Sequence, residues 1–114
     1  MKFFLSLLSI FSIILSFNFD LVYGQEIDLD DGAQVFSQRC TACHSGGNNA
    51  INPDKTLKID ALEKYEKDNV DAIILQVTNG KAEGGMPAFG DILSKDQIQN
   101  VANYVLNQAK NQSW

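Results

Sequence analysis

Apolar residues recur three and four positions apart in several short stretches of the chain, which is the spacing of amphipathic helices. A first helix is predicted over 28–40, and a last helix after Ser94 and Gln97, which have the spacing of a capping box. The predicted apolar face of the first helix is Leu29, Gly32, Ala33 and Phe36. That of the last helix is Ile98, Val101, Ala102, Val105 and Leu106. No stretch alternates as a half-buried strand does, so the pattern predicts an all-α fold.

Two shorter helices are predicted between these, over 60–67 with Asp60 as its cap and over 69–80. The second begins at Asn69 and ends at Gly80, residue types that favour the start and the stop of a helix. Helices of this length are marginal alone, and so small a domain buries little apolar surface. The chain therefore needs a central group around which the helices can pack.

The N-terminal region has the pattern of an export signal. A lysine precedes an uncharged run, 3–19, and Val22 and Gly24 stand three and one positions before a potential cleavage point. The alternative is a permanent membrane anchor, but the run has 17 residues, is interrupted by four serines and is short for a span. We therefore expect 1–24 to be a cleaved signal peptide and 25–114 to be the exported domain.

Composition and charge exclude some classes of protein. A length of 114 residues allows one small domain. Nine Lys and Arg against fourteen Asp and Glu give a net charge of −5 without a basic cluster, which argues against nucleic-acid binding. Two cysteines are too few for a scaffold of several disulfides.

Both cysteines and the single histidine lie within five residues, CTACH, from Cys40 to His44. A redox disulfide, a zinc site and an attached haem all use these residue types. Redox C-x-x-C motifs accompany a βαβ pattern and zinc sites usually pair two ligand clusters, and the sequence offers neither. C-x-x-C-H is the attachment motif of haem c. We predict that Cys40 and Cys43 form thioethers to one haem and that His44 ligates its iron.

The second axial position of the iron requires another ligand. Met86 is the single methionine after Met1, and it lies in the Gly-rich stretch EGGMPAFG, within a predicted surface loop. Pro87 restricts this loop, and Met/His ligation is a recognised pairing in cytochromes c. We predict Met86 as the second ligand. The alternatives are a methionine that fills the core, or an iron position left open or filled by water.

Beyond the haem motif, the chain resembles the cytochrome c6 family, the photosynthetic cytochromes c of algae and cyanobacteria. The resemblance runs from Asp28 to Trp114 and is carried by DLDDGAQVFSQRCTACHSGGNNAINPDKTLK, QVTNGK, MPAFG and VANYVLNQAKNQSW. It implies the class I cytochrome c fold, with four or five short helices packed around one covalently bound haem c. It also implies Cys40 and Cys43 as attachment residues, with His44 and Met86 as axial ligands.

The resemblance further implies a function in photosynthetic electron transport. The protein would be a soluble electron carrier that acts as a monomer, and not an enzyme. It would take electrons from cytochrome f of the cytochrome bf complex and pass them to photosystem I, in the thylakoid lumen of a plastid or cyanobacterium. It would bind no nucleic acid and would not be membrane-embedded after processing. The alternative is a respiratory cytochrome c that donates to a terminal oxidase.

Individual roles are also implied by the resemblance. Pro53 matches a proline whose carbonyl orients the ligand imidazole, and Gln76 matches a residue packed by the haem. Gly32 and Phe36 match positions where the first helix crosses the last one near Tyr104.

Two departures from the family pattern concern the region after the helix over 69–80. Ala82 to Gly85 includes an apparent insertion, and Ile92 stands where relatives commonly carry an arginine associated with docking on photosystem I. We expect docking to use acidic side chains and an apolar rim. The acidic candidates are Glu63, Glu66, Asp68 and Asp71, and the apolar ones are Ala88, Phe89 and Ile92.

Overall fold

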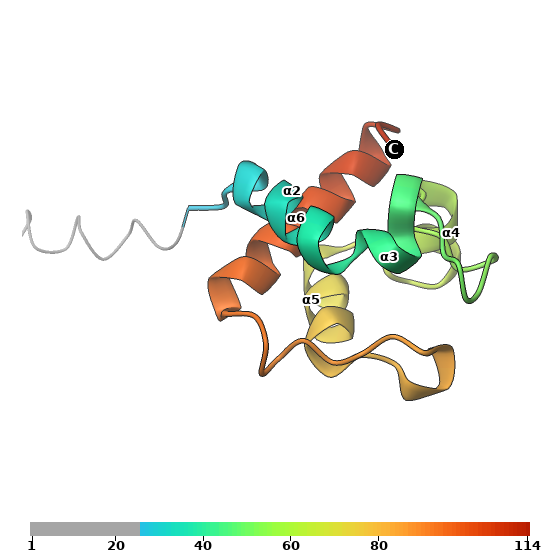
Figure 1. Cartoon of the computed structure of the whole chain (residues 1–114). Helices are drawn as coiled ribbons and strands as arrows, with labels where there is room; N and C mark the ends of the chain where they lie inside the picture. Colours follow the sequence, from blue (N-terminus) through green and yellow to red (C-terminus); the bar gives the residue numbers. More distant parts are fainter. Residues whose placement is uncertain (1–25) are drawn as a thin grey trace, which may run out of the picture.

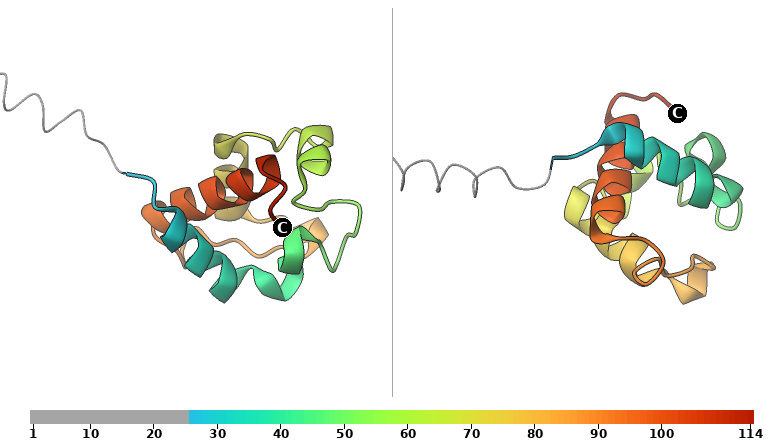
Figure 2. Two further views of the ribbon diagram at one scale, coloured as in Figure 1. Left: turned by 90° about the horizontal axis from the view of Figure 1, so that it is seen from above. Right: turned by 60° about the vertical axis from the view of Figure 1, so that its left-hand side comes forward.

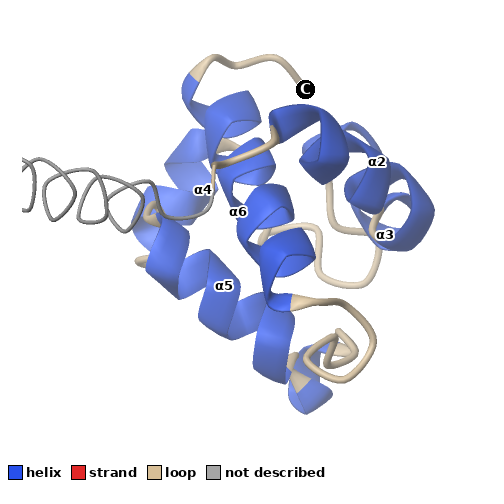
Figure 3. Cartoon of the chain, turned by 90° about the vertical axis from the view of Figure 1, so that its left-hand side faces the viewer, coloured by secondary structure: helices blue, strands red, loops and turns tan. Residues whose placement is uncertain are grey.

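The computed structural model describes residues 26–114, so the predicted signal peptide and its cleavage point lie outside the described residues. Within 26–114 the chain is helix and loop, and its one piece of β pairing is an isolated bridge between Lys81 and Met86 (Figure 3). The all-α prediction is confirmed. No helix in this part of the chain is long and apolar enough to cross a membrane.

Five α-helices and two short 3₁₀ turns follow one another along the described residues. They are α2 (Leu29–Arg39), α3 (Thr41–His44), η1 (Ser45–Gly47), α4 (Ile59–Lys64), α5 (Val70–Asn79), η2 (Ala82–Gly84) and α6 (Lys95–Lys110). The number agrees with the predicted four or five short helices. Figure 1 shows α2 crossing α6, with α3 continuing beyond the end of α2 and α5 below.

The helix ends follow the predicted capping chemistry in two of three cases. Asn69 caps α5 by accepting a bond from the Ala72 backbone N–H at 2.8 Å, and the helix stops at Gly80. The predicted capping box at the start of α6 is present. The predicted cap at Asp60 is wrong: α4 begins at Ile59, with Lys58 at the cap position, and Asp60 lies in its first turn. There its carboxylate is close to the positive end of the helix dipole.

The crossing of α2 and α6 depends on Gly32. A Cβ atom at this position would lie 2.3 Å from the backbone oxygen of Asn100, so any larger residue would push the helices apart. The ring of Phe36 packs against that of Tyr104 with centroids 5.5 Å apart. These contacts confirm the crossing implied by the resemblance. Leu29, in contrast, is 41% exposed and not part of the buried face, because it precedes the crossing.

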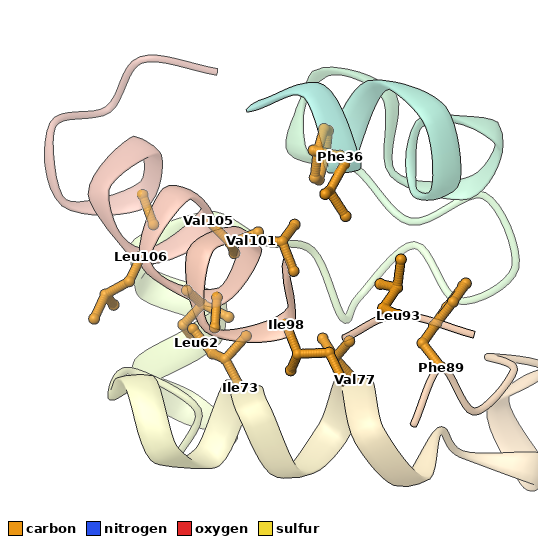
Figure 4. Close-up of a cluster of buried hydrophobic side chains, with 13 residues drawn as sticks. Phe36, Leu62, Ile73, Val77, Phe89, Leu93, Ile98, Val101, Val105 and Leu106 are labelled. Carbon is orange, nitrogen blue, oxygen red and sulfur yellow. The ribbon is translucent and has the colours of Figure 1, made fainter. Parts of the chain in front are cut away.

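The apolar core lies between α2, α5 and α6, as the stick view in Figure 4 shows. All five apolar residues predicted for α6 are buried. The loop after Met86 is joined to this core, because Phe89 and Leu93 are each 8% exposed. The Phe89 N–H also donates to the carbonyl of Val77 at 2.9 Å. The loop is therefore fixed against the end of α5 just after it passes Met86.

Candidate functional site

The CTACH stretch forms a single helical turn that follows α2 after a bend. Cys40 ends α2, and its carbonyl accepts from the backbone N–H groups of Cys43 and His44 at 3.2 and 2.8 Å. Residues three and four positions apart on a helix lie on the same face. The turn therefore places both thiols and the imidazole on one side of the chain, as attachment of a single group requires.

The imidazole of His44 is held by a backbone carbonyl. Its Nδ1 lies 2.8 Å from the oxygen of Asn48, which leaves Nε2 free to bind a metal. The implied partner Pro53 is therefore wrong. Gly46 and Gly47 have φ values of 64° and 76°, which reverse the chain and bring the Asn48 carbonyl back to the ring. The pair of glycines that follows His44 and Ser45 was the sequence signal for this acceptor.

The environment of the cysteines argues against the two other uses of the motif. Burial raises the pKa of the Cys40 thiol to about 11, whereas redox-active cysteines have a lowered pKa. Among residues 26–114, no three His, Cys, Asp or Glu side chains are grouped so that they could hold a metal ion, as a zinc site requires. Two unpaired thiols beside an imidazole with a free Nε2 fit the covalent attachment of haem.

Met86 closes a tight turn that contains the apparent insertion. Lys81 and Met86 exchange both backbone hydrogen bonds, at 2.9 and 3.1 Å, and η2 lies between them. Gly80 makes this possible, because its φ is 65° and a Cβ there would lie 2.6 Å from the Met86 oxygen. The predicted surface loop is therefore an ordered turn that presents a half-buried methionine.

The methionine turn and the CTACH turn lie at the same end of the molecule, where they face each other (Figure 2). The loop that follows the CTACH turn approaches the methionine turn, because a Cβ on Gly85 would lie 2.9 Å from the Cδ1 atom of Ile51. A donor set divided between two facing segments suits a flat group bound from both sides. The residues present therefore fit a haem with His44 and Met86 as its axial ligands.

Gln76 connects α5 with the methionine turn. Its side-chain Nε2 lies 3.8 Å from the Sδ atom of Met86, within the range of a weak N–H···S hydrogen bond. The resemblance implied that the haem packs against this residue, and the structure adds a contact with the methionine sulfur. An amide at this position both orients the thioether and withdraws electron density from its sulfur.

Comparisons with known proteins agree with this site. A family model described as "Cytochrome C oxidase, cbb3-type, subunit III" matches residues 27–105. Cytochrome c6 of Gracilaria tenuistipitata var. liui is 57% identical over 84 residues, 74% of this chain and 76% of the relative. Cytochrome c6 of Porphyra purpurea is 58% identical over 83 residues, 73% of this chain and 74% of the relative.

The chain is also similar to a solved structure. The crystal structure of cytochrome c6 from the diatom Phaeodactylum tricornutum superimposes with a TM-score of 0.70 at 48% sequence identity. The match covers 74% of this chain and 97% of the diatom protein. The similarity therefore includes the helix arrangement as well as the sequence.

Proposed function

Since this chain belongs to the cytochrome c6 family and carries one covalently bound haem c, we propose that it shuttles electrons from cytochrome f of the cytochrome bf complex to photosystem I. The family consists of electron carriers, and the haem iron supplies the one-electron chemistry. The observation that carries the proposal is the divided donor set, His44 on one turn and Met86 on the other. With His44 and Met86 both bound to the iron, no position on it would be left for a substrate, which supports a carrier rather than an enzyme.

The geometry of the two turns supports these roles. Cys40 and Cys43 would hold the haem through thioethers, and His44 and Met86 would bind its iron through Nε2 and Sδ. The Asn48 carbonyl fixes the orientation of the imidazole, and such outer partners also raise the basicity of the ligand. Because both residues belong to turns closed by backbone hydrogen bonds, the protein would hold them in the same positions in the oxidised and the reduced state.

Replacing Gln76 by leucine is expected to lower the reduction potential by on the order of 20–60 mV. The amide withdraws electron density from the Met86 sulfur, and without it the sulfur donates more strongly and stabilises the oxidised iron. Protein-film voltammetry or a redox titration measures the shift. The control Leu75→Gln changes an exposed neighbour on α5 and should leave the potential unaltered. Equal potentials for Gln76→Leu and the wild type would show that the amide has no influence.

Docking on photosystem I would use charged side chains and an apolar rim. The structure shows which of the candidate side chains are exposed. The acidic candidates are all exposed and lie in α4, in the connection after it and at the start of α5: Glu63, Glu66, Asp68 and Asp71. Of the apolar candidates, Ala88 and Ile92 are exposed, but Phe89 is 8% exposed and belongs to the core. Ile51, 57% exposed and next to the methionine turn, is an apolar rim residue that the sequence analysis missed.

Flash-induced oxidation by isolated photosystem I tests the proposed function. We expect a second-order reaction that slows as salt is raised, because exposed charges are screened over about 10 Å at 0.1 M ionic strength. The variant Glu66→Lys/Asp68→Lys should slow the reaction at low salt and approach the wild-type rate at high salt. The control Glu26→Lys/Asp30→Lys has the same net charge as this variant, but its two substitutions lie near the start of α2.

Two results would count against the proposal in different ways. Rates that do not depend on salt would remove the electrostatic docking. Failure of photosystem I to oxidise the wild-type protein, together with oxidation by a terminal oxidase, would favour the respiratory alternative.

The proposed place of action is the thylakoid lumen, where the processed chain would act as a monomer that is not embedded in the membrane. Cleavage between Gly24 and Gln25 should release it. The intact mass of the purified holoprotein is then expected to equal residues 25–114 plus one haem. A mass that includes the apolar run 3–19 would show an anchored protein and contradict the cleavage.

A further inference from the structure

Trp114 is fixed to the crossing of the first and last helices. Its ring lies 5.1 Å from the ring of Phe36 in α2 and 6.1 Å from that of Tyr104 in α6, measured between centroids. Aromatic pairs at these separations are favourable contacts beyond their burial of apolar area. The indole is therefore held by the crossing of α2 and α6, although Trp114 itself lies beyond the end of α6.

The indole also contacts the loop that follows the CTACH turn. A Cβ on Gly47 would lie 2.4 to 2.7 Å from three indole carbons, so the ring rests directly on the Gly47 backbone. The indole Nε1–H donates to the carbonyl of Leu57 at 3.0 Å. Leu57 in turn donates its N–H to the Gly47 carbonyl at 2.8 Å. Trp114 thus fastens the two ends of the loop over 47–57 to each other and to the helices.

This loop begins beside the carbonyl that holds the imidazole. Asn48 follows Gly47 directly, and its oxygen is the partner of His44 Nδ1 at 2.8 Å. Within the loop, Asn49 bonds to the backbone of Asn52 and Lys55, which keeps the segment in one shape. A loop that is rigid internally moves as a unit, so the contact that anchors Gly47 also fixes the direction of the Asn48 carbonyl.

We infer that Trp114 is a positioning residue for His44: it holds the Gly47–Asn48 backbone so that Asn48 keeps its bond to Nδ1 and Nε2 keeps its direction. The inference rests on the proposed ligation of the haem iron by His44. Trp114 acts from a distance, through Gly47 and Leu57. Loss of the indole would loosen the Nδ1–H bond and expose that proton to exchange with solvent more often.

The exchange rate of the His44 Nδ1 proton, measured by NMR on ¹⁵N-labelled, reduced holoprotein, tests this inference. We expect Trp114→Ala to accelerate exchange of the His44 Nδ1 proton by roughly tenfold. This factor corresponds to the free energy of about one hydrogen bond. Trp114→Phe should accelerate it less, because a phenyl ring still covers Gly47 but lacks the N–H that bonds Leu57.

The matched control is Asn100→Ala, which loosens the same helix crossing without touching the loop. Asn100 is buried, donates to an Asp31 carboxylate oxygen at 2.9 Å and accepts from the Asp28 N–H at 3.0 Å. The free energy of unfolding of each variant is measured with denaturant, so that exchange is compared at equal loss of stability. Asn100→Ala should leave the Nδ1 rate near that of the wild type.

Two outcomes would overturn the inference. One is an unchanged rate in Trp114→Ala. The other is equal acceleration in Trp114→Ala and Asn100→Ala at equal stability, which would reduce Trp114 to a general packing residue. Neither outcome depends on oxidation by photosystem I, so a failure of the proposed acceptor is seen separately, in the flash kinetics of the wild type.

Discussion

Replacing Met86 by alanine is expected to leave the haem attached while opening the second axial position of its iron. Attachment would depend on Cys40 and Cys43, which belong to the CTACH turn and not to the methionine turn. The potential should fall by on the order of 0.1 V or more, because the thioether favours reduced iron and axial ligand identity spreads haem potentials over about 0.8 V. Cyanide or imidazole should bind readily to the oxidised variant. Redox titration and ligand-binding kinetics measure both effects.

The control for this variant is Ile92→Ala, which removes an exposed apolar side chain from the same loop without a proposed ligand role. It should keep the wild-type spectrum and potential. A Met86→Ala protein that matches the wild type in both properties would show that Met86 is not the ligand, and the methionine would then be a packing residue of its turn.

Replacing His44 by alanine is expected to have a larger effect, on the formation of the holoprotein itself. The imidazole shares one face of the turn with both thiols, so its loss removes the contact that would hold the iron beside them. Replacing a residue that only hydrogen-bonds to a metal ligand lowers metal affinity or activity by about 10- to 100-fold. Replacing the ligand itself should lower the yield of holoprotein by at least as much. The ratio of haem absorbance to total protein after expression with the maturation machinery measures the yield.

Asn48→Ala is the matched control for this experiment. It keeps the backbone carbonyl that accepts from Nδ1 and removes only an exposed side chain, so its yield of holoprotein should stay near that of the wild type. Equal yields for His44→Ala and the wild type would contradict the proposed role of the imidazole in assembly.

Features with local chemical causes could be predicted from the sequence. The capping box of α6 and the Asn69 cap of α5 use side chains three residues from their partners, so the pattern contains the whole interaction. The start of α4 at Ile59 and the exposure of Leu29 could not be predicted in this way. Both depend on where neighbouring segments lie.

The same distinction applies to the site. The residues of CTACH lie on one turn, and their spacing alone predicts a shared face. Met86 could be predicted as a ligand because it is the single methionine after Met1, but its turn was expected only as a surface loop. The contact between Gly85 of this turn and Ile51 joins two loops more than thirty positions apart. The bond from Trp114 to Leu57 spans 57 positions and has no local pattern that indicates it. Only the folded chain brings these two residues together.

The chemical shift of the Met86 methyl group tests the central claim most directly. This claim is that two facing turns supply the two axial ligands of one haem. Met86 is the single methionine among residues 25–114, so ¹³C-methyl-methionine gives one labelled signal in the processed protein. A methyl group held over the iron experiences the ring current of the porphyrin. In the NMR spectrum of the reduced protein, we expect a single methyl resonance displaced far upfield. A resonance at the ordinary position of a methionine methyl would contradict it.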